Sequence, residues 1–250
     1  MIIGHRGASV LAPENTVAAF ERALDDAADG IELDVRLAKD GVPVVIHDGT
    51  LQRTGLMSGE VAQMTSQELA DIHVGAWFNR ANPALAQAEY EKQKVPTLRD
   101  VLHRFEQCAV YVELKTDSAP TVNDLVQTVI DTILETDSQE RVVVVSFDHT
   151  AIQTIKSLNS SVRTGALFEP RRRPGLSWRA EAMLNAAADC GADEILPHRL
   201  LARPKLIEKA RDRNLPVVVW TVDDPSWLAR AKNLGIRGLI TNNPARMVVA

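Results

Sequence analysis

The sequence predicts an α/β protein, a TIM (β/α)8 barrel with a small insertion after its second strand. Two observations support this prediction. Short runs rich in β-branched residues alternate with stretches whose apolar residues recur three and four positions apart, and such alternation implies a parallel sheet covered by helices. At 250 residues with 45% hydrophobic side chains, the chain has the size of one barrel and can bury one large core. We therefore expect a single domain spanning residues 1–250.

The expected elements follow one another in a regular βα rhythm. Eight strands are expected over residues 1–4, 30–35, 109–114, 141–147, 162–168, 194–197, 216–222 and 238–241. Helices are expected over residues 15–28, 122–135, 150–158, 178–190, 205–213 and 225–234. Pro204 and Pro225 stand at helix starts, where a missing N–H costs nothing. Gly191 and Gly235 follow helical runs and are expected to end them.

One interval interrupts this rhythm. Residues 49–95 contain no clear strand and are too many for a βα loop, so we expect an insertion at the barrel rim. Residues 65–68, Thr-Ser-Gln-Glu, form a capping-box pattern that predicts a short helix, and Trp77 with Phe78 is expected to anchor the insertion to the barrel. Just before it, Asp40-Gly41 predicts a hairpin turn that returns the chain beside the second strand to His47.

Composition excludes some classes of function. The formal charge of −5 and the lack of a basic cluster beyond residues 171–173 argue against nucleic-acid binding, and we interpret that arginine run as a solvated loop. No window approaches the roughly 18 apolar residues that a membrane span needs. The first motif begins within four residues of Met1, which leaves no room for a secretion signal, so we expect a cytoplasmic protein without stable membrane association. Cys108 and Cys190 are expected to be packing residues and not a disulfide.

In a βα barrel the site lies at the carboxyl ends of the strands. The polar or aromatic residues at these ends are His5, Arg6, Glu32, Asp34, Glu113, Lys115, Ser146, Asp148, His198 and Trp220. Because residues two apart on a strand share a face, three carboxylates and one lysine converge on one mouth. Such a cluster needs a cation, a proton or a basic partner. Carboxylate oxygens in that number suit Mg²⁺ or Ca²⁺ better than zinc.

Two histidines adjoin this cluster. His5 ends the first strand and His47 is folded back beside the second, so the two imidazoles are placed to act as general acid and general base on a phosphorus or carbonyl centre. Trp220 is placed to pack an alkyl or glycerol portion of a ligand. The role of His198 stays open. The simpler interpretation of each carboxylate, a salt bridge at the barrel rim, does not account for the histidines.

The motifs closely resemble one family. HRGASVLAPENT, ELDVRLAKDG, PVVIHDGTLQRT, VPTLRDVL, VELK, VVSFD, WTVD and LITNNP occur in this order over nearly the whole chain, and they are similar to those of the glycerophosphodiester phosphodiesterases. The resemblance implies a TIM-barrel enzyme that uses a divalent metal to hydrolyse glycerophosphodiesters to sn-glycerol 3-phosphate and an alcohol.

The resemblance also implies a role for each site residue. The implied metal ligands are Glu32, Asp34 and Glu113, the acid/base pair is His5 and His47, the phosphate contacts are Arg6 and Lys115, and Trp220 packs near the glycerol or leaving group. Glu14 and Asn15 are expected to shape the first loop and to hydrogen-bond near the site. The chain departs from the family pattern at Gly49 and at Asp223, where the family often has Asn.

Alternatives remain within and beyond this interpretation. A lysophospholipase D or phospholipase-type activity on lipid needs an apolar ramp at the mouth, for which the insertion offers only Trp77 and Phe78. A barrel that binds phosphodiesters or metal without turnover has no need for two acid/base groups. The leaving alcohol, the choice between Mg²⁺ and Ca²⁺, the nucleophile (water or a substrate hydroxyl), and the oligomeric state stay open at this point.

Overall fold

The strands form a nearly continuous ring. The computed structural model describes residues 1–117, 122–170 and 179–248, and within these ranges eight parallel strands lie side by side in the order β7-β6-β5-β4-β2-β1-β9-β8. Single bridges from Ile195 to Val217 and from His198 to Trp220 close the ring between β7 and β8. The strands are β1 (Ile2–His5), β2 (Gly30–Leu37), β4 (Ala109–Leu114), β5 (Val142–Ser146), β6 (Arg163–Phe168), β7 (Glu194–Pro197), β8 (Val218–Val219) and β9 (Gly238–Thr241). The predicted fold class is confirmed.

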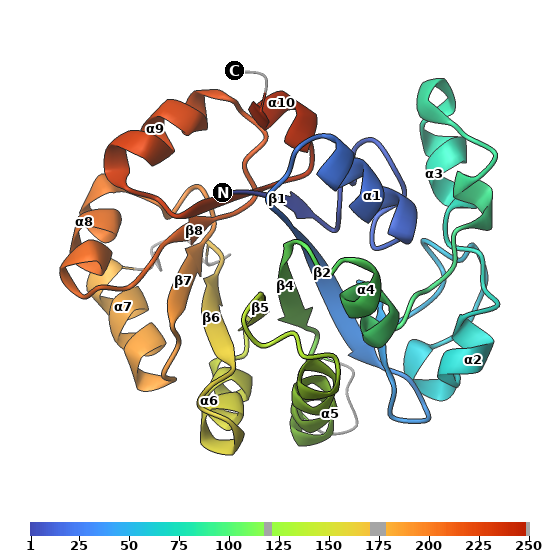
Figure 1. Cartoon of the computed structure of the whole chain (residues 1–250), viewed down its shortest axis with the longest axis horizontal. Coiled ribbons are helices and arrows are strands. Elements are labelled where there is room, and N and C mark those ends of the chain that lie inside the picture. The colour runs from blue at the N-terminus through green and yellow to red at the C-terminus, as the bar shows by residue number, and fades with distance from the viewer. Residues whose placement is uncertain (118–121, 171–178, 249–250) are drawn as a thin grey trace.

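Helices surround the ring of strands (Figure 1). They are α1 (Val17–Asp25), α4 (Leu98–Arg104), α5 (Val122–Glu135), α6 (His149–Leu158), α7 (Ala180–Asp189), α8 (Pro204–Asp212), α9 (Ser226–Leu234) and α10 (Pro244–Val248). The main core lies between strands and helices. A smaller core fills the barrel and includes Ile3, Tyr111, Val145, Leu196 and Ile240. The barrel is therefore packed, and a ligand has room only at its ends.

Some elements differ from their predicted bounds for local reasons. The helix predicted over 15–28 is the shorter α1, because the Thr16 side chain caps it and Ala27 adopts a φ of 60° beyond its end. The strand predicted over 216–222 has only two ladder residues, since the barrel closes there through single bridges. Gly235 ends α9 in the left-handed conformation, as predicted. Residues 171–173 and the predicted helix start at residue 178 lie outside the described ranges.

The insertion follows a hairpin. The last three residues of β2, Val35 to Leu37, pair antiparallel with β3 (Pro43–Val45), and Gly41 supplies the positive φ of 78° in the turn. The segments that follow are η1 (Val61–Gln63), α2 (Ser66–Leu69), α3 (Ala76–Ala81), η2 (Pro83–Leu85) and η3 (Tyr90–Lys92). Thr65 and Glu68 form the predicted capping box of α2. Phe78 clusters with Ala19 of α1, which confirms the predicted anchor beside that helix (Figure 1).

Two further expectations concern the whole chain. Cys108 and Cys190 are both buried and free, as predicted. Among the described residues, no helix combines the length and the apolar character that crossing a bilayer requires.

Candidate active site

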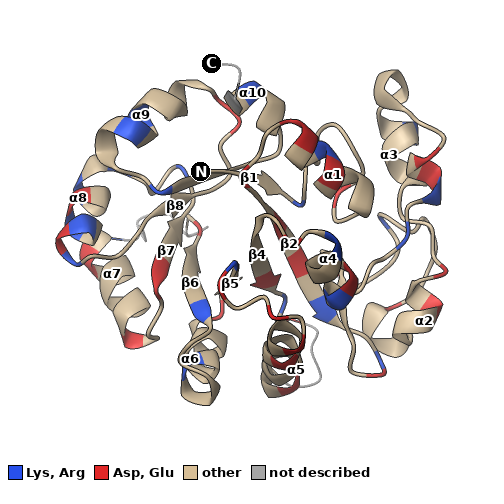
Figure 2. Ribbon diagram, viewed as in Figure 1, with Lys and Arg blue, Asp and Glu red and all other residues tan. Residues whose placement is uncertain are grey.

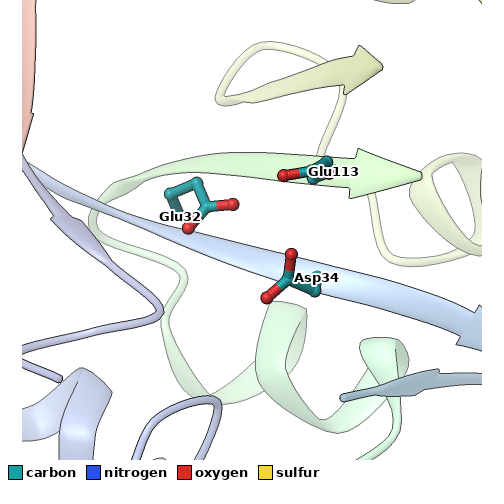
Figure 3. A group of neighbouring side chains, drawn as sticks. All are labelled: Glu32, Asp34 and Glu113. Atoms are coloured by element: carbon teal, nitrogen blue, oxygen red, sulfur yellow. The ribbon is translucent and has the colours of Figure 1, made fainter. Parts of the chain in front are cut away.

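Three carboxylates meet inside the carboxyl end of the barrel. Glu32 and Asp34 share one face of β2, and Asp34 stands opposite Glu113 in the register between β2 and β4. One oxygen from each side chain lies within 4.8 Å of the others, and all three residues are buried. Figure 3 shows the carboxylates turned toward one another, and the acidic positions of β2 and β4 are adjacent in Figure 2. The sequence spacing therefore predicted this convergence correctly.

The three carboxyl groups titrate very differently. Burial opposes the ionisation of Asp34, but the nearby Arg6 and Lys115 cations hold its pKa well below the usual range. Burial, followed by the negative charge of Asp34, raises the pKa of Glu32 to about 8 and that of Glu113 to about 7. The cluster thus attracts either protons or a cation, and an all-oxygen donor set of this kind fits a hard divalent ion such as Mg²⁺ or Ca²⁺.

Two cationic side chains flank Asp34. Arg6 Nε lies 3.1 Å from Asp34 Oδ2, and Lys115 Nζ lies 2.9 Å from Asp34 Oδ1. Lys115 also forms an ion pair with Glu113. Arg6 has a positive φ of 57°, which turns its backbone N–H toward Glu32 Oε2 at 2.9 Å. Both predicted phosphate contacts therefore lie in the carboxylate cluster.

His5 lies at the edge of the cluster. It ends β1 opposite Glu32, with 3.9 Å between His5 Nε2 and Glu32 Oε2. The other ring nitrogen, Nδ1, is 2.7 Å from Asn242 Oδ1. Burial and the Arg6 charge lower the pKa of His5 below its ordinary value, against the opposing effect of the Asn242 hydrogen bond.

His47 lies where the hairpin returns to the barrel. His47 Nδ1 is 2.6 Å from Asp48 Oδ1, and Arg36 Nε donates to the His47 carbonyl at 2.7 Å. Burial lowers the pKa of His47, with Arg6 acting in the same direction and Asp34 against it. These contacts fix the ring and its backbone together.

A hydrogen-bond network links the first loop to the site. Asn15 Nδ2 donates to Asp34 Oδ2 at 2.8 Å, and Asn15 Oδ1 accepts from the Asp34 N–H at 3.2 Å. Glu14 accepts from Arg6 at 2.9 Å and from both terminal nitrogens of Arg53. The expected hydrogen-bonding role of Glu14 and Asn15 is confirmed.

Several neighbours of the site escaped the sequence analysis. Arg53 Nε donates to Asp48 Oδ2 at 2.6 Å, so Arg53 joins the His47 side of the site to Glu14. Asp48 and Arg53 belong to the same run as His47, and this proximity in sequence was the available signal. Asn242 carried no such signal, because it is 237 residues away from His5 in the sequence.

The Trp220 side chain lies between the mouth of the barrel and the core inside it. Its indole Nε1 donates to the Leu196 carbonyl at 2.7 Å, and its ring packs edge-on against Phe147 and His198 with centroid separations of 5.4 and 5.1 Å. The half-buried ring also packs against the core inside the barrel. Trp220 is thus rigidly held beside the mouth, and its contact with substrate stays a prediction.

Similarity to known proteins agrees with this geometry. The Glycerophosphoryl diester phosphodiesterase family matches residues 5–246, a range that includes every predicted site residue. The chain belongs to this family. The predicted enzyme class, a glycerophosphodiester phosphodiesterase, is thereby confirmed.

Relatives of this family match over almost their full length. A glycerophosphodiester phosphodiesterase of Caldanaerobacter subterraneus subsp. tengcongensis is 30% identical, with 99% of this chain and 96% of the relative aligned. The solved structure of a glycerophosphodiester phosphodiesterase from Agrobacterium tumefaciens superposes with a TM-score of 0.80 at 28% identity, covering 100% of this chain and 99% of that one. A phosphodiesterase of Oleispira antarctica, solved with the product sn-glycerol-3-phosphate, shares the fold with a TM-score of 0.83 at 22% identity, covering 99% and 94%.

Proposed function

We propose that this glycerophosphodiester phosphodiesterase hydrolyses small glycerophosphodiesters to sn-glycerol 3-phosphate and an alcohol, with a divalent cation and a pair of histidines. The observation that carries the proposal is the buried carboxylate triad beside His5, with Arg6 and Lys115 on its flank. Family membership supplies the reaction class.

The proposed metal ligands are Glu32, Asp34 and Glu113. Burial and the negative charge of Asp34 raise the pKa values of Glu32 and Glu113, and a doubly charged ion would offset both effects. When bound, Mg²⁺ or Ca²⁺ supplies Lewis-acid polarisation of a phosphoryl oxygen. Asn15 holds Asp34 by two hydrogen bonds, so one ligand is fixed in place before any ion arrives.

Arg6 and Lys115 are proposed to bind the phosphate. Both cations already lie against Asp34, one on each of its carboxylate oxygens. A phosphodiester placed there offers further oxygens for charge-assisted hydrogen bonds. These contacts strengthen as negative charge grows on the phosphoryl oxygens.

The two histidines differ in the group that orients them. His47 is hydrogen-bonded to a carboxylate, Asp48, which favours the imidazolium against the lowering of the His47 pKa by burial, whereas His5 is hydrogen-bonded to the neutral amide of Asn242. We assign His5 as the base and His47 as the acid. His5 takes the proton of the attacking water, or of a substrate hydroxyl whose cyclic phosphate a water then opens, as the attacking oxygen bonds to phosphorus. The ester P–O bond then breaks, and His47 gives its proton to the departing alcohol oxygen.

The proposed substrates are small and water-soluble. Phe78 is buried against α1, so it is not available as part of an apolar ramp for lipid. The Oleispira relative binds sn-glycerol-3-phosphate, the product expected here. The cytoplasmic location, the lack of nucleic-acid partners and the single-domain organisation over residues 1–250 stay predictions.

The first experiment measures release of sn-glycerol 3-phosphate from glycerophosphocholine, glycerophosphoethanolamine and glycerophosphoglycerol. The protein is assayed after chelation and then with Mg²⁺, Ca²⁺ or Mn²⁺ restored. Metal-dependent release that is lost in His5→Ala, while calorimetry shows metal binding retained, supports the proposal. Release from lysophospholipids alone shifts the substrate class to lipids, and no release from either class favours a binding protein.

A further inference from the structure

Three adjacent strands end in a chain of hydrogen bonds that reaches the His5 ring. Asp223 follows β8, Asn242 follows β9, and His5 ends β1, and these strands are neighbours in the barrel. Asn242 Nδ2 donates to Asp223 Oδ2 at 2.8 Å. Asn242 Oδ1 lies 2.7 Å from His5 Nδ1. The amide therefore connects a carboxylate to the imidazole.

The position of Asp223 is fixed by the loop that carries Asn242. Asp223 Oδ1 accepts from the Asn242 backbone N–H at 2.8 Å and from Thr241 Oγ1 at 2.9 Å. Both carboxylate oxygens are thus engaged by residues 241 and 242, although they are 18 and 19 positions away in sequence. The carboxylate is held in a set position relative to the amide.

This carboxylate dictates which way the Asn242 amide faces. An ionised carboxylate only accepts hydrogen bonds, so the amide NH₂ must face Asp223. The reversed amide would bring two oxygen acceptors within 2.8 Å of each other. Ser9 Oγ also donates to Asn242 Oδ1, at 3.2 Å. The amide oxygen consequently faces His5.

The amide oxygen in turn selects a tautomer. Because that oxygen can only accept, His5 Nδ1 must carry the proton, and the lone pair of the neutral ring lies on Nε2. Nε2 is the ring atom that lies 3.9 Å from Glu32 Oε2, at the carboxylate cluster. We propose that Asp223 is a positioning residue that acts through Asn242 to hold His5 in the tautomer protonated at Nδ1, with Nε2 free to accept a proton. The inference rests on the proposed role of His5 as the base.

The tautomer can be observed without turnover. Two-bond ¹H–¹⁵N correlation spectra of ¹⁵N-histidine-labelled protein show which ring nitrogen carries the proton, and His5→Gln identifies the His5 signals. We expect Nδ1–H in the wild-type protein at neutral pH. In Asp223→Asn the new amide presents an NH₂ to Asn242, so the Asn242 amide turns over and His5 changes to the Nε2–H form.

A double variant that moves the carboxylate from position 223 to position 242 tests whether residue 223 orients residue 242 and, through it, His5. In the double variant Asp223→Asn, Asn242→Asp, residue 223 donates to a carboxylate at 242 that again accepts from His5 Nδ1. We expect this double variant to restore the Nδ1–H tautomer.

We also expect Asp223→Asn to lower kcat about 10- to 100-fold with KM changed less than threefold, and the double variant to recover most of that loss. Asp224→Ala is the matched control, because Asp224 is exposed and accepts from the backbone N–H of Ser226 at the start of α9. It should alter neither the tautomer nor kcat.

The outcomes separate this inference from the proposed function. A wild-type His5 protonated at Nε2, or the same tautomer in wild type and Asp223→Asn, overturns the inference even when the enzyme is active. An inactive protein whose His5 shows the expected tautomer and its reversal keeps the inference while the proposed reaction fails. The wild-type spectrum alone shows which ring nitrogen of His5 carries the proton. The inference can therefore be overturned even if a variant does not fold.

Discussion

At the scale of single residues, the site is a set of charged groups whose properties come from their neighbours. Arg6 and Lys115 hold the pKa of Asp34 low, whereas burial, followed by the charge of Asp34, raises the pKa of Glu32 and Glu113. The ionised Asp34 therefore adds to the effect of burial on its two neighbours. Perturbation of this kind, in a cluster that also contains histidines, is characteristic of catalytic sites.

Replacing the proposed acid should reduce turnover without removing the metal site. For His47→Gln we expect kcat to fall about 10²- to 10⁴-fold, the usual contribution of a general acid. Metal affinity, measured by calorimetry, should change less than threefold, because His47 is not among the carboxylate ligands. Unchanged kcat, or loss of metal binding together with activity, would contradict the assigned role.

The stabilisation by metal should grow with pH. Folding raises the pKa of Glu32 to about 8 and that of Glu113 to about 7, so their protonated forms are favoured in the folded state. That contribution is complete below the unfolded-state pKa near 4.5 and is lost as pH rises through 7 and 8. A bound cation replaces the lost protons. We expect Mg²⁺ or Ca²⁺ to raise Tm more at pH 8.5 than at pH 6, measured by calorimetry.

The control for this pH effect is the double variant Glu32→Gln, Glu113→Gln. It carries no titrating group at either position, so both the metal-induced rise in Tm and its dependence on pH should disappear. An equal rise at both pH values in the wild-type protein would be evidence against proton displacement by the ion.

At the scale of elements, aromatic side chains of the insertion pack against one another and, through Phe78, against Ala12 and Ala19 of the first loop and helix α1. Phe78 of α3 is buried and packs edge-on against Tyr90 and Trp77, with centroid separations of 5.7 and 5.9 Å. Arg53, which binds Asp48 and Glu14, also lies over the Trp77 ring at 5.6 Å. Arg53 therefore links the aromatic residues of the insertion to Asp48, the hydrogen-bond partner of His47.

Removing this anchor should destabilise the protein. Phe78→Ala leaves a cavity beside α1, and we expect a loss of about 3–5 kcal/mol in the free energy of unfolding, measured with urea. Leu85→Ala, in the same insertion but 38% exposed, should cost less than about 0.5 kcal/mol. Equal effects of the two substitutions would show that Phe78 does not anchor the insertion.

At the scale of the whole molecule, the two ends of the barrel hold different groups of charged residues, the carboxylate cluster at the carboxyl end and an ion-pair network at the amino end. Glu194, at the start of β7, is buried and accepts from Tyr111 at 3.0 Å, and it pairs with Arg163 at 2.7 Å and Arg237 at 3.1 Å. These residues lie on β4 and β6 and directly before β9. The network joins several strands at the amino end, opposite the carboxylate cluster. Polar groups at that end of a TIM barrel serve stability.

Substitution at the amino end should separate stability from catalysis. For Glu194→Gln we expect the free energy of unfolding to fall by about 3 kcal/mol, the lower end of the range for a buried pair because the arginines are partly exposed. The kcat should remain within twofold of wild type. Glu208→Gln, exposed on α8, is the matched control and should leave both quantities unchanged. A large fall in kcat for Glu194→Gln in folded protein would argue against this separation.

Local patterns determined much of the fold and of the candidate site. Strand and helix periodicities predicted the barrel, the pattern of residues 65–68 predicted the capping box at Thr65, and Asp40-Gly41 predicted the hairpin. Each of these patterns depends on residues that are near one another in sequence. The two-residue spacings of Glu32 with Asp34 and of Glu113 with Lys115 predicted the charged cluster for the same reason.

The tertiary structure decided which partners complete the site. Asn242 reaches His5 across 237 positions, and Asp223 joins them only because β8, β9 and β1 are adjacent when the barrel closes. The pKa shifts also depend on this closure, since burial and the approach of charges from different strands produce them. By itself the sequence determined which groups stand at the strand ends. The folded barrel determined their protonation and orientation, because these depend on distances between residues far apart in the chain.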